Sequence, residues 1–255
     1  MSFEPKDRLD GRVAVITGGK GAIGLASARR LAALGVRIVS LDRSDPAAVQ
    51  ALLDALPAVA AGPHIAITAS ISDSASLQAA AQAVAERAGR CDILINSAGF
   101  TKAVPPGDLD GLTDALFDDI VQTNLRGVFA TIRAFAPLLK ASGDGLIVNV
   151  SSIAGFTGAG SNLAYVAAKA GVDILTKSLA KALAPQVRVL AVSPGVVDSG
   201  FVPGRGADFN DKAAVTIPLK RIGTVEDIAS AIEACATTLR FATGSRFVID
   251  GGRSL

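Results

Sequence analysis

Short apolar runs alternate with longer Ala-rich segments of helical pattern almost from end to end of the chain. The runs are apolar at nearly every position, which predicts the strands of a parallel sheet that is covered on both faces. These predicted strands are 13–17, 37–42, 65–69, 92–96, 146–150, 187–192 and 246–250. The longer segments predict helices near 23–34, 47–56, 73–88, 113–140, 165–184 and 224–238.

This alternation predicts an α/β fold: a Rossmann-like, doubly wound, seven-stranded parallel sheet flanked by helices. The chain has 255 residues, and no repeat, low-complexity tract or linker divides it. We therefore expect a single domain over 1–255. Residues 196–223 are irregular and rich in Gly and Pro. A loop of that length in a compact domain predicts a substrate-binding loop or lid.

Composition narrows the class of protein. Half of the residues are hydrophobic and the net charge is only +2, with acidic and basic residues interspersed. That balance favours a folded core and gives no basic surface for nucleic acid. The first residues lack the apolar stretch of a signal peptide, and no uncharged apolar run reaches about 18 residues. We expect a cytoplasmic protein outside the membrane.

The scarcity of metal-binding side chains excludes other chemistry. Cys91, Cys235 and His64 are the only cysteines and the only histidine. Three scattered residues do not make the usual zinc sites, so we predict no metal. A Ser-His-Asp hydrolase would depend on His64, which lies in a loop before a predicted strand. That class is therefore disfavoured.

A Gly-rich turn joins the first predicted strand to the first predicted helix. It reads Thr17-Gly-Gly-Lys-Gly-Ala-Ile-Gly24. Small residues there allow a tight turn and let a pyrophosphate approach the free N–H groups of the helix N-terminus. In this strand–turn–helix setting, the turn predicts a dinucleotide site. The predicted contacts are Gly18, Lys20, Gly21, Ile23 and Gly24.

An acidic residue closes the second predicted strand. The carboxylate of Asp42 can accept hydrogen bonds from both hydroxyls of an adenosine ribose and would repel a 2′-phosphate. This favours NAD over NADP. Lys20 and Arg43 lie nearby in the sequence and either is able to meet a 2′-phosphate, so NADP stays open.

The chain contains one tyrosine, Tyr165, and Lys169 follows it by four residues. On a helix these positions share a face, and a nearby cation lowers the pKa of a phenol. A phenol of that kind can exchange a proton with an alcohol or a carbonyl group. Taken alone, the pair is more typical of a packed tyrosine beside a solvated lysine. Ser152 precedes Tyr165 by thirteen residues, and this spacing joins the pair to a wider pattern.

Further motifs complete that pattern: Asn96-Ser97-Ala98-Gly99 after the fourth strand, Asn124 in a helix, and Pro194-Gly195 after the sixth strand. Together with the Gly-rich turn and the serine, tyrosine and lysine, they make the chain resemble the short-chain dehydrogenase/reductase family over nearly its whole length. The resemblance implies that Tyr165 is the general acid/base, with Ser152 on the substrate oxygen.

The same resemblance implies that Lys169 lowers the pKa of Tyr165 and holds the nicotinamide ribose, and that Asn124 supports a water in the proton relay. Without the resemblance, an Asn at position 124 would equally satisfy local backbone groups. It also implies further cofactor contacts, at Ser70, Ile71, Asn96, Ala98, Gly99, Tyr165, Lys169, Pro194, Gly195, Val197 and Ser199. Ala22, Ser97, Ser70 and Ser199 depart from the usual family residues.

Aromatic residues near the predicted loops indicate an apolar substrate wall. The expected pocket residues are Phe100, Ser152, Phe156, Tyr165 and Phe201, and Phe209 is a further candidate. In the loop, Arg205 and Lys212 are able to meet an acidic substrate group, although a solvated lid explains them as well.

These observations predict an NAD(H)-dependent oxidoreductase that interconverts a secondary alcohol and a ketone. The alternatives are an NADPH-dependent reductase of 3-oxoacyl thioesters and a catalytically silent cofactor-binding protein. By resemblance we also expect a homotetramer, with the helices near 113–140 and 165–184 forming interfaces and the C-terminal segment forming another.

Overall fold

The structure, a computed structural model, describes residues 9–203 and 208–255. Seven parallel strands form one sheet, as predicted, and their order is β3-β2-β1-β4-β5-β6-β7. The strands are β1 (Val13–Thr17), β2 (Arg37–Asp42), β3 (Ile65–Thr68), β4 (Ile93–Asn96), β5 (Gly145–Val150), β6 (Val187–Pro194) and β7 (Arg246–Ile249).

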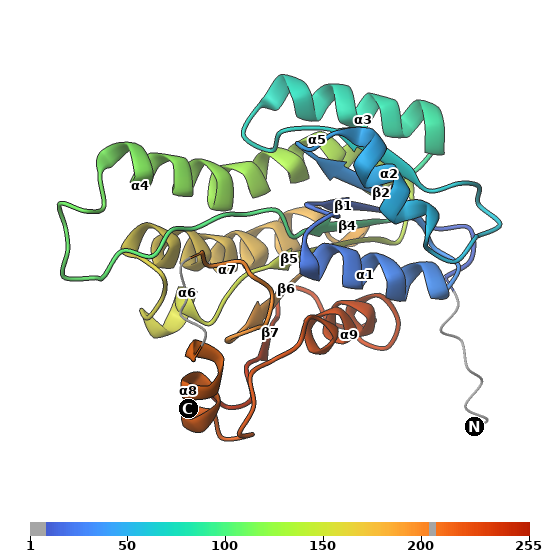
Figure 1. Cartoon of the computed structure of the whole chain (residues 1–255). Coiled ribbons are helices and arrows are strands. Elements are labelled where there is room, and N and C mark those ends of the chain that lie inside the picture. The colour runs from blue at the N-terminus through green and yellow to red at the C-terminus, as the bar shows by residue number, and fades with distance from the viewer. Residues whose placement is uncertain (1–8, 204–207) are drawn as a thin grey trace.

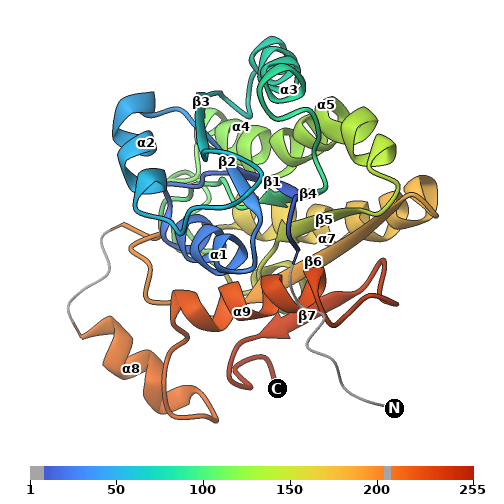
Figure 2. The same ribbon diagram turned by 90° about the vertical axis from the view of Figure 1, so that its right-hand side faces the viewer.

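Helices cover both faces of this sheet in a single domain (Figures 1 and 2). Alternate residues of β1 serve the two faces, as strand geometry requires. Ala14 and Ile16 are buried with side chains of α1, α2 and α9, whereas Val13 and Val15 are buried with those of α3, α5 and α7. These helices are α1 (Ala22–Ala33), α2 (Pro46–Asp54), α3 (Ser74–Ala88), α5 (Gly127–Ala141), α7 (Leu163–Leu183) and α9 (Val225–Ala236).

The strand order reverses between β1 and β4. The chain passes from β1 through β2 to β3 on one side, then returns to place β4 on the other side of β1. The turns after β1 and β4 therefore meet, and a Cβ on Gly18 would lie only 2.9 Å from the Cα of Ala98. Open α/β sheets bind their ligands at such a switch point, outside the carboxyl ends of the strands.

The helix predicted over 113–140 is interrupted. The structure has α4 (Asp114–Val121), a five-residue π-helical segment, η1 (Gln122–Arg126), and then α5. Two short helices escaped prediction: α6 (Ala154–Thr157), and α8 (Phe209–Thr216) inside the predicted loop 196–223. In α8 only Ala213 is buried, so the sequence carries no apolar period to reveal it. No helix in the described ranges is long and apolar enough to cross a membrane.

Candidate active site

The Gly-rich turn leaves a cradle at the N-terminus of α1. Gly18 has a φ of +66°, and a Cβ on Gly24 would overlap the carbonyl oxygen of Gly18. Gly21 precedes the helix, and no side chain caps the first N–H groups. Free N–H groups at a helix N-terminus bind anions, so the turn fits a pyrophosphate. Ala22 is the first residue of the helix and lines the same cavity.

Asp42 lies beside this turn at the end of β2. Its Oδ2 accepts hydrogen bonds from the backbone N–H of Lys20 at 3.2 Å and from the Ser40 hydroxyl at 2.6 Å. Burial raises the pKa of Asp42, and these hydrogen bonds oppose that rise. The Lys20 ammonium points to Ser44, where its Nζ is 3.3 Å from the hydroxyl oxygen. A carboxylate is thus fixed where an adenosine ribose is expected.

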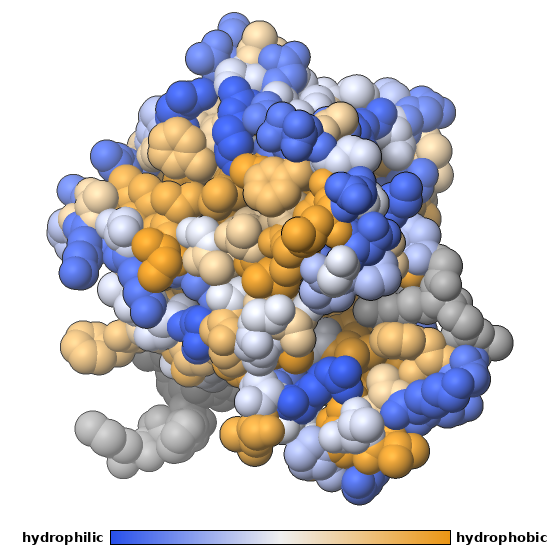
Figure 3. All heavy atoms as spheres, turned by 90° about the vertical axis from the view of Figure 1, so that its left-hand side faces the viewer, coloured by the Kyte–Doolittle hydropathy of each residue, from blue (hydrophilic) through white to orange (hydrophobic). Residues whose placement is uncertain are grey.

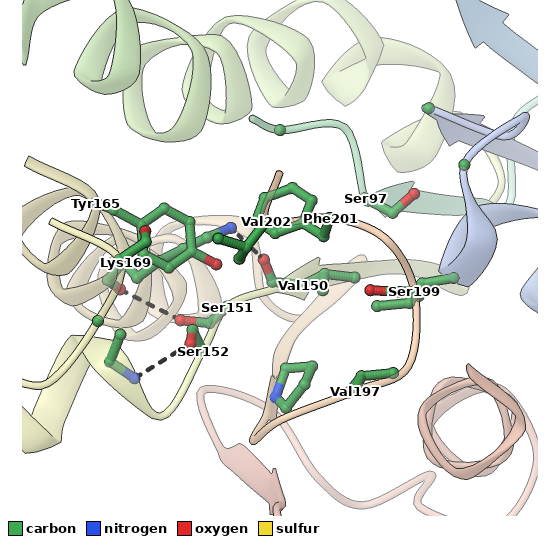
Figure 4. Close-up of a pocket in the computed structure, with 18 of the residues that line it drawn as sticks. Ser97, Val150, Ser151, Ser152, Tyr165, Lys169, Val197, Ser199, Phe201 and Val202 are labelled. Atoms are coloured by element: carbon green, nitrogen blue, oxygen red, sulfur yellow. Dashed lines mark hydrogen bonds between the residues drawn. The ribbon is translucent and has the colours of Figure 1, made fainter. Parts of the chain in front are cut away.

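Tyr165 lies in the first turn of α7 and faces the segment that follows β5 (Figure 4). Asn162 begins the helix, because its Oδ1 accepts a hydrogen bond from the Tyr165 N–H at 2.8 Å. The Asn162 amide also donates to the Lys102 carbonyl at 2.8 Å, which ties the helix start to the loop after β4. The position of the tyrosine is therefore set by packing between distant segments.

Lys169 is a buried cation one turn after Tyr165, with its side chain only 5% exposed. Its Nζ lies 5.6 Å from the centroid of the Tyr165 ring and donates to the Val150 carbonyl at 2.7 Å. Burial lowers the pKa of Lys169 to about 8, and the negative charge of Asp173 opposes this shift. Asp173 is itself buried and accepts a hydrogen bond from Arg246 at 2.8 Å.

The two serines after β5 differ in their surroundings. Ser151 is 2% exposed, and its hydroxyl donates to the Lys169 carbonyl at 3.3 Å. Ser152 is half-buried, and its Oγ accepts from the Ala154 N–H at 3.2 Å, so its own hydroxyl hydrogen stays free to point elsewhere. Both line the cavity, and Ser152 lies beside Tyr165 (Figure 4). The choice of Ser152 over Ser151 as the catalytic serine stays a prediction.

Asn124 is fully buried inside η1 and does not line the cavity. Its Nδ2 donates to the carbonyls of Ile120 at 2.9 Å and Phe100 at 2.8 Å. Its Oδ1 has no partner in the described part of the chain, and a Cβ on Gly99 would come within 2.6 Å of it. The side chain therefore joins the π-helical segment to the loop after β4. Its expected part in a proton relay stays a prediction.

One cavity of about 1480 Å³ joins the Gly-rich turn to the tyrosine. The residues that connect the two ends come from the carboxyl ends of β1, β2, β4, β5 and β6. Most predicted site residues line it, namely Gly18, Lys20, Gly21, Ile23, Gly24, Asp42, Ile71, Ala98, Gly99, Ser152, Tyr165, Lys169, Pro194, Gly195, Val197, Ser199 and Phe201. Phe201 also packs on Tyr165, with ring centroids 6.0 Å apart.

Two phenylalanines that the sequence predicted in the substrate pocket, Phe100 and Phe156, do not line the cavity. Phe156 belongs to the short helix α6, which turns its ring away from the cavity to lie under the Arg246 guanidinium, 3.9 Å from the ring centroid. Phe100 does not line the cavity either, and only its backbone carbonyl is used, by Asn124. Arg205, a candidate for an acidic substrate group, lies outside the described residues.

Two predicted cofactor contacts also lie outside the lining. Ser70 does not line the cavity, although its neighbours Ala69 and Ile71 do, and its backbone N–H donates to the Ser76 hydroxyl at 3.0 Å. Asn96 is 3% exposed, and its amide donates to the Asn149 side chain at 2.9 Å. Both positions therefore support the fold beneath the cavity rather than its surface.

Other lining residues were missed from the sequence. They include the segments 103–106 and 159–161, Val202 in the loop after β6, and Thr216 and Arg253. The first two segments were open to prediction, because one follows Gly99 and the other precedes Tyr165. Arg253 carried no signal of its own, since only the folding of the C-terminal tail brings it to the cavity.

The sequence is similar to a known family and to named proteins. A sequence profile described as enoyl-(acyl carrier protein) reductase matches residues 18–254. A Streptomyces violaceoruber protein named as a ketoacyl reductase of the granaticin polyketide synthase is 35% identical over 256 residues, 98% of each chain. The 3-oxoacyl-(acyl-carrier-protein) reductase of Escherichia coli (strain K12) is 30% identical over 246 residues, 96% of this chain and 98% of its own.

Solved structures point the same way. The crystal structure of levodione reductase superposes with a TM-score of 0.88 at 31% identity, covering 97% of this chain and 99% of the other. The predicted fold is therefore confirmed, and so is the family that the motifs indicated. The chain belongs to the short-chain dehydrogenase/reductase family of oxidoreductases, which use NAD(P).

Proposed function

We propose that the chain is an NAD(H)-dependent oxidoreductase that interconverts a secondary alcohol and a ketone. The observation that carries the proposal is the grouping of Tyr165, Ser152 and buried Lys169 in the cavity that Asp42 also lines. The Gly18–Gly24 cradle would hold the pyrophosphate, and Asp42 the adenosine ribose. The nicotinamide, when bound, supplies or receives the hydride.

The protein's own part in the reaction is to position the substrate and move a proton. Tyr165 takes the hydroxyl proton of an alcohol during oxidation and returns it to the carbonyl oxygen during reduction. Ser152 donates a hydrogen bond to the substrate oxygen, where negative charge develops. The buried ammonium of Lys169 favours the phenolate form of Tyr165. Phe201 covers the tyrosine and helps to exclude water.

A 3-oxoacyl thioester reductase is the second candidate. It is favoured by the names of the two relatives described above, both ketoacyl reductases. Its usual NADPH dependence is disfavoured by Asp42, whose carboxylate would repel a 2′-phosphate. Enoyl reduction is not proposed, because enoyl reductases of this fold space the tyrosine and the lysine further apart, whereas Lys169 follows Tyr165 by only four positions.

Substitution Tyr165→Phe tests the proposal. It removes the hydroxyl alone, so turnover of every substrate should fall by a factor on the order of 1,000 while NADH binding is retained. A panel of cyclic alcohols, sugar alcohols, hydroxy acids and acyl thioesters, followed by NADH absorbance, provides the measurement. Retention of wild-type turnover by a variant that still binds NADH would overturn the role of Tyr165.

The cofactor preference is a separate prediction. Wild-type protein should bind NADH more tightly than NADPH, and Asp42→Ala should narrow that difference by a factor on the order of 10 or more by relieving repulsion of the 2′-phosphate. Titration of intrinsic cofactor fluorescence gives both affinities. A wild-type preference for NADPH would reject this reading of Asp42 and favour the second candidate.

The proposal also includes assembly and location. The homotetramer and the cytoplasmic location predicted from the sequence are kept here as proposals. Exposed apolar side chains on α4, α5 and α7 support self-association: Phe117, Phe129, Leu163 and Ile174 are 39%, 40%, 38% and 60% exposed. The face that lies on the left in Figure 1 shows a broad band of apolar side chains (Figure 3).

A further inference from the structure

Among the described residues that line the cavity, five carry a charge: Lys20, Asp42, Arg43, Lys169 and Arg253. The first three gather around the end of β2, where the adenosine is expected, and Lys169 lies beneath Tyr165. Arg253 alone comes from the C-terminal tail. The proposed cofactor and proton chemistry leave this arginine without a role.

The tail is held in a defined position against the segment that follows α8. Asp250 accepts hydrogen bonds from the backbone N–H groups of Gly252 and Ser254, each at 2.8 Å. The Gly251 carbonyl accepts from the Leu219 N–H at 3.2 Å, and a Cβ on Gly252 would lie 2.9 Å from Pro218. Contacts with the segment after α8 thus hold the backbone before Arg253, and the hydrogen bond from Ser254 to Asp250 holds it after Arg253.

The tail also begins next to the nicotinamide end of the cavity. Gly195, which follows β6 and lines the cavity, approaches Asp250 so closely that a Cβ on it would lie 2.7 Å from the Asp250 Cβ. In Figures 1 and 2 the C-terminal end and α8 lie on the same lower side of the sheet. Phe209 and Thr216, at the two ends of α8, line the cavity together with Arg253.

The guanidinium of Arg253 has N–H groups that are available to bind a ligand. Its Nη1 donates to the Thr216 hydroxyl at 2.9 Å, and it forms no ion pair with any residue in the described ranges. A guanidinium has five N–H donors in a planar fork that matches a carboxylate, sulfonate or phosphate. Asp42 is the one acidic group among the described lining residues, and it lies at the other end. At the substrate end, therefore, no acidic side chain among the described lining residues faces the exposed guanidinium of Arg253.

The geometry points to Arg253 as a specificity residue that binds an anionic group of the substrate. This inference rests on the proposed function and narrows it: the preferred substrate is a secondary alcohol or ketone that also bears a carboxylate, sulfonate or phosphate. Lys212 does not share this role, because it forms an ion pair with Asp208 on α8 and does not line the cavity.

Matched pairs of probes test the inference. The acids acetoacetate, 4-oxopentanoate and 5-oxohexanoate are compared with their methyl esters, because the reach from Tyr165 to Arg253 selects one chain length. Acetonesulfonate and 2-oxopropylphosphonate serve as the sulfonate and phosphate arms. For wild type, Arg253→Gln, Arg253→Lys and the control Lys212→Gln, we measure kcat/KM with NADH and thermal stabilisation of the NADH complex of Tyr165→Phe by each probe.

The wild type should prefer at least one anionic probe over its neutral partner. Arg253→Gln should lower kcat/KM for that probe by a factor on the order of 10 to 100 and change the ester by less than about 3-fold, because a charge-assisted hydrogen bond is lost. Arg253→Lys should recover part of the loss, and Lys212→Gln should behave as wild type.

Three results would overturn the inference: no anion preference in the wild type, an equal effect of Arg253→Gln on acid and ester, or a change confined to NADH affinity. The last would place the guanidinium on the cofactor. Failure of the proposed function looks different. In that case Tyr165→Phe would retain full turnover, whatever the anion preference. Loss of turnover in Tyr165→Phe with retained binding of the anionic probe would support the proposed function and the role of Arg253.

Discussion

At the scale of single residues, the proposed site contains a cation, Lys169, whose burial lowers the stability of the folded protein. Lys169 is 5% exposed, and burial lowers its pKa to about 8, so keeping it protonated near neutral pH opposes folding. The Val150 carbonyl and the charge of Asp173 offset part of this cost. Catalytic residues often lower the stability of a folded protein, and the burial of Lys169 agrees with the role that we propose for it.

Replacement of Lys169 by Met should therefore abolish turnover yet alter stability in a pH-dependent way. Between the folded pKa of about 8 and the ordinary value of 10.5, the unfolded chain holds a proton that the folded chain has released. The penalty on wild-type stability is thus fully present below pH 8 and fades as the pH rises.

The difference in free energy of unfolding, wild type minus Lys169→Met, should become more positive by about 2 kcal/mol between roughly pH 7.5 and pH 9.5. Urea unfolding of the cofactor-free proteins at several pH values gives this difference, and shared effects of pH on other groups cancel in it. A difference that stays flat with pH would mean that Lys169 is not desolvated as the structure has it.

At the scale of elements, the start of α1 shows how a backbone contact creates the cofactor cradle. Gly24 allows the helix to pack against the Gly18 carbonyl, and Gly18 allows the turns after β1 and β4 to meet. The sequence predicted this turn from its glycines. The π-helical segment η1 was not predicted, because a helix with an extra residue in one turn keeps nearly the same apolar pattern.

Gly24→Ala should lower the free energy of unfolding by about 2 kcal/mol or more and weaken NADH binding at least about 10-fold, because the new Cβ meets backbone atoms that have nowhere to move. Gly107→Ala is the matched control, since no atom lies within 4 Å of the place where its new Cβ would stand. Denaturant unfolding and cofactor titration measure both effects. Equal behaviour of the two variants would show that the close packing at Gly24 is unimportant.

At the scale of the whole molecule, the sheet order brings the turn after β1, the serines after β5 and the loop after β6 to one edge. The same architecture leaves apolar side chains exposed on α4, α5 and α7. A contiguous apolar face of this kind is typical of an interface, and it agrees with the proposed homotetramer.

Ile174 on α7 is 60% exposed in the single chain. Ile174→Glu should weaken the proposed tetramer, because the new charge would be buried at the contact between subunits. Light scattering after size exclusion should give a tetramer for wild type and a smaller species for the variant. Ala79→Glu places the same charge on the exposed side of α3 and should leave the tetramer intact. A monomeric wild type would refute the proposed assembly.

The sequence by itself determined the elements that local patterns encode. Apolar runs marked all seven strands, the glycines marked the turn between β1 and α1, and the spacing of Ser152, Tyr165 and Lys169 marked the proposed site. Each of these depends on backbone geometry or on residues close together in the sequence, so a linear pattern can carry it.

Only the tertiary structure decided which side chains reach the cavity. Phe156 was expected there and instead lies under Arg246, whereas Arg253 was not expected and lines it. Asn124 was expected near the reacting groups, and its side-chain amide donates hydrogen bonds to the Ile120 and Phe100 carbonyls. The direction of a side chain after a short helix or a Gly-rich tail depends on packing between segments far apart in the chain, which no local pattern encodes.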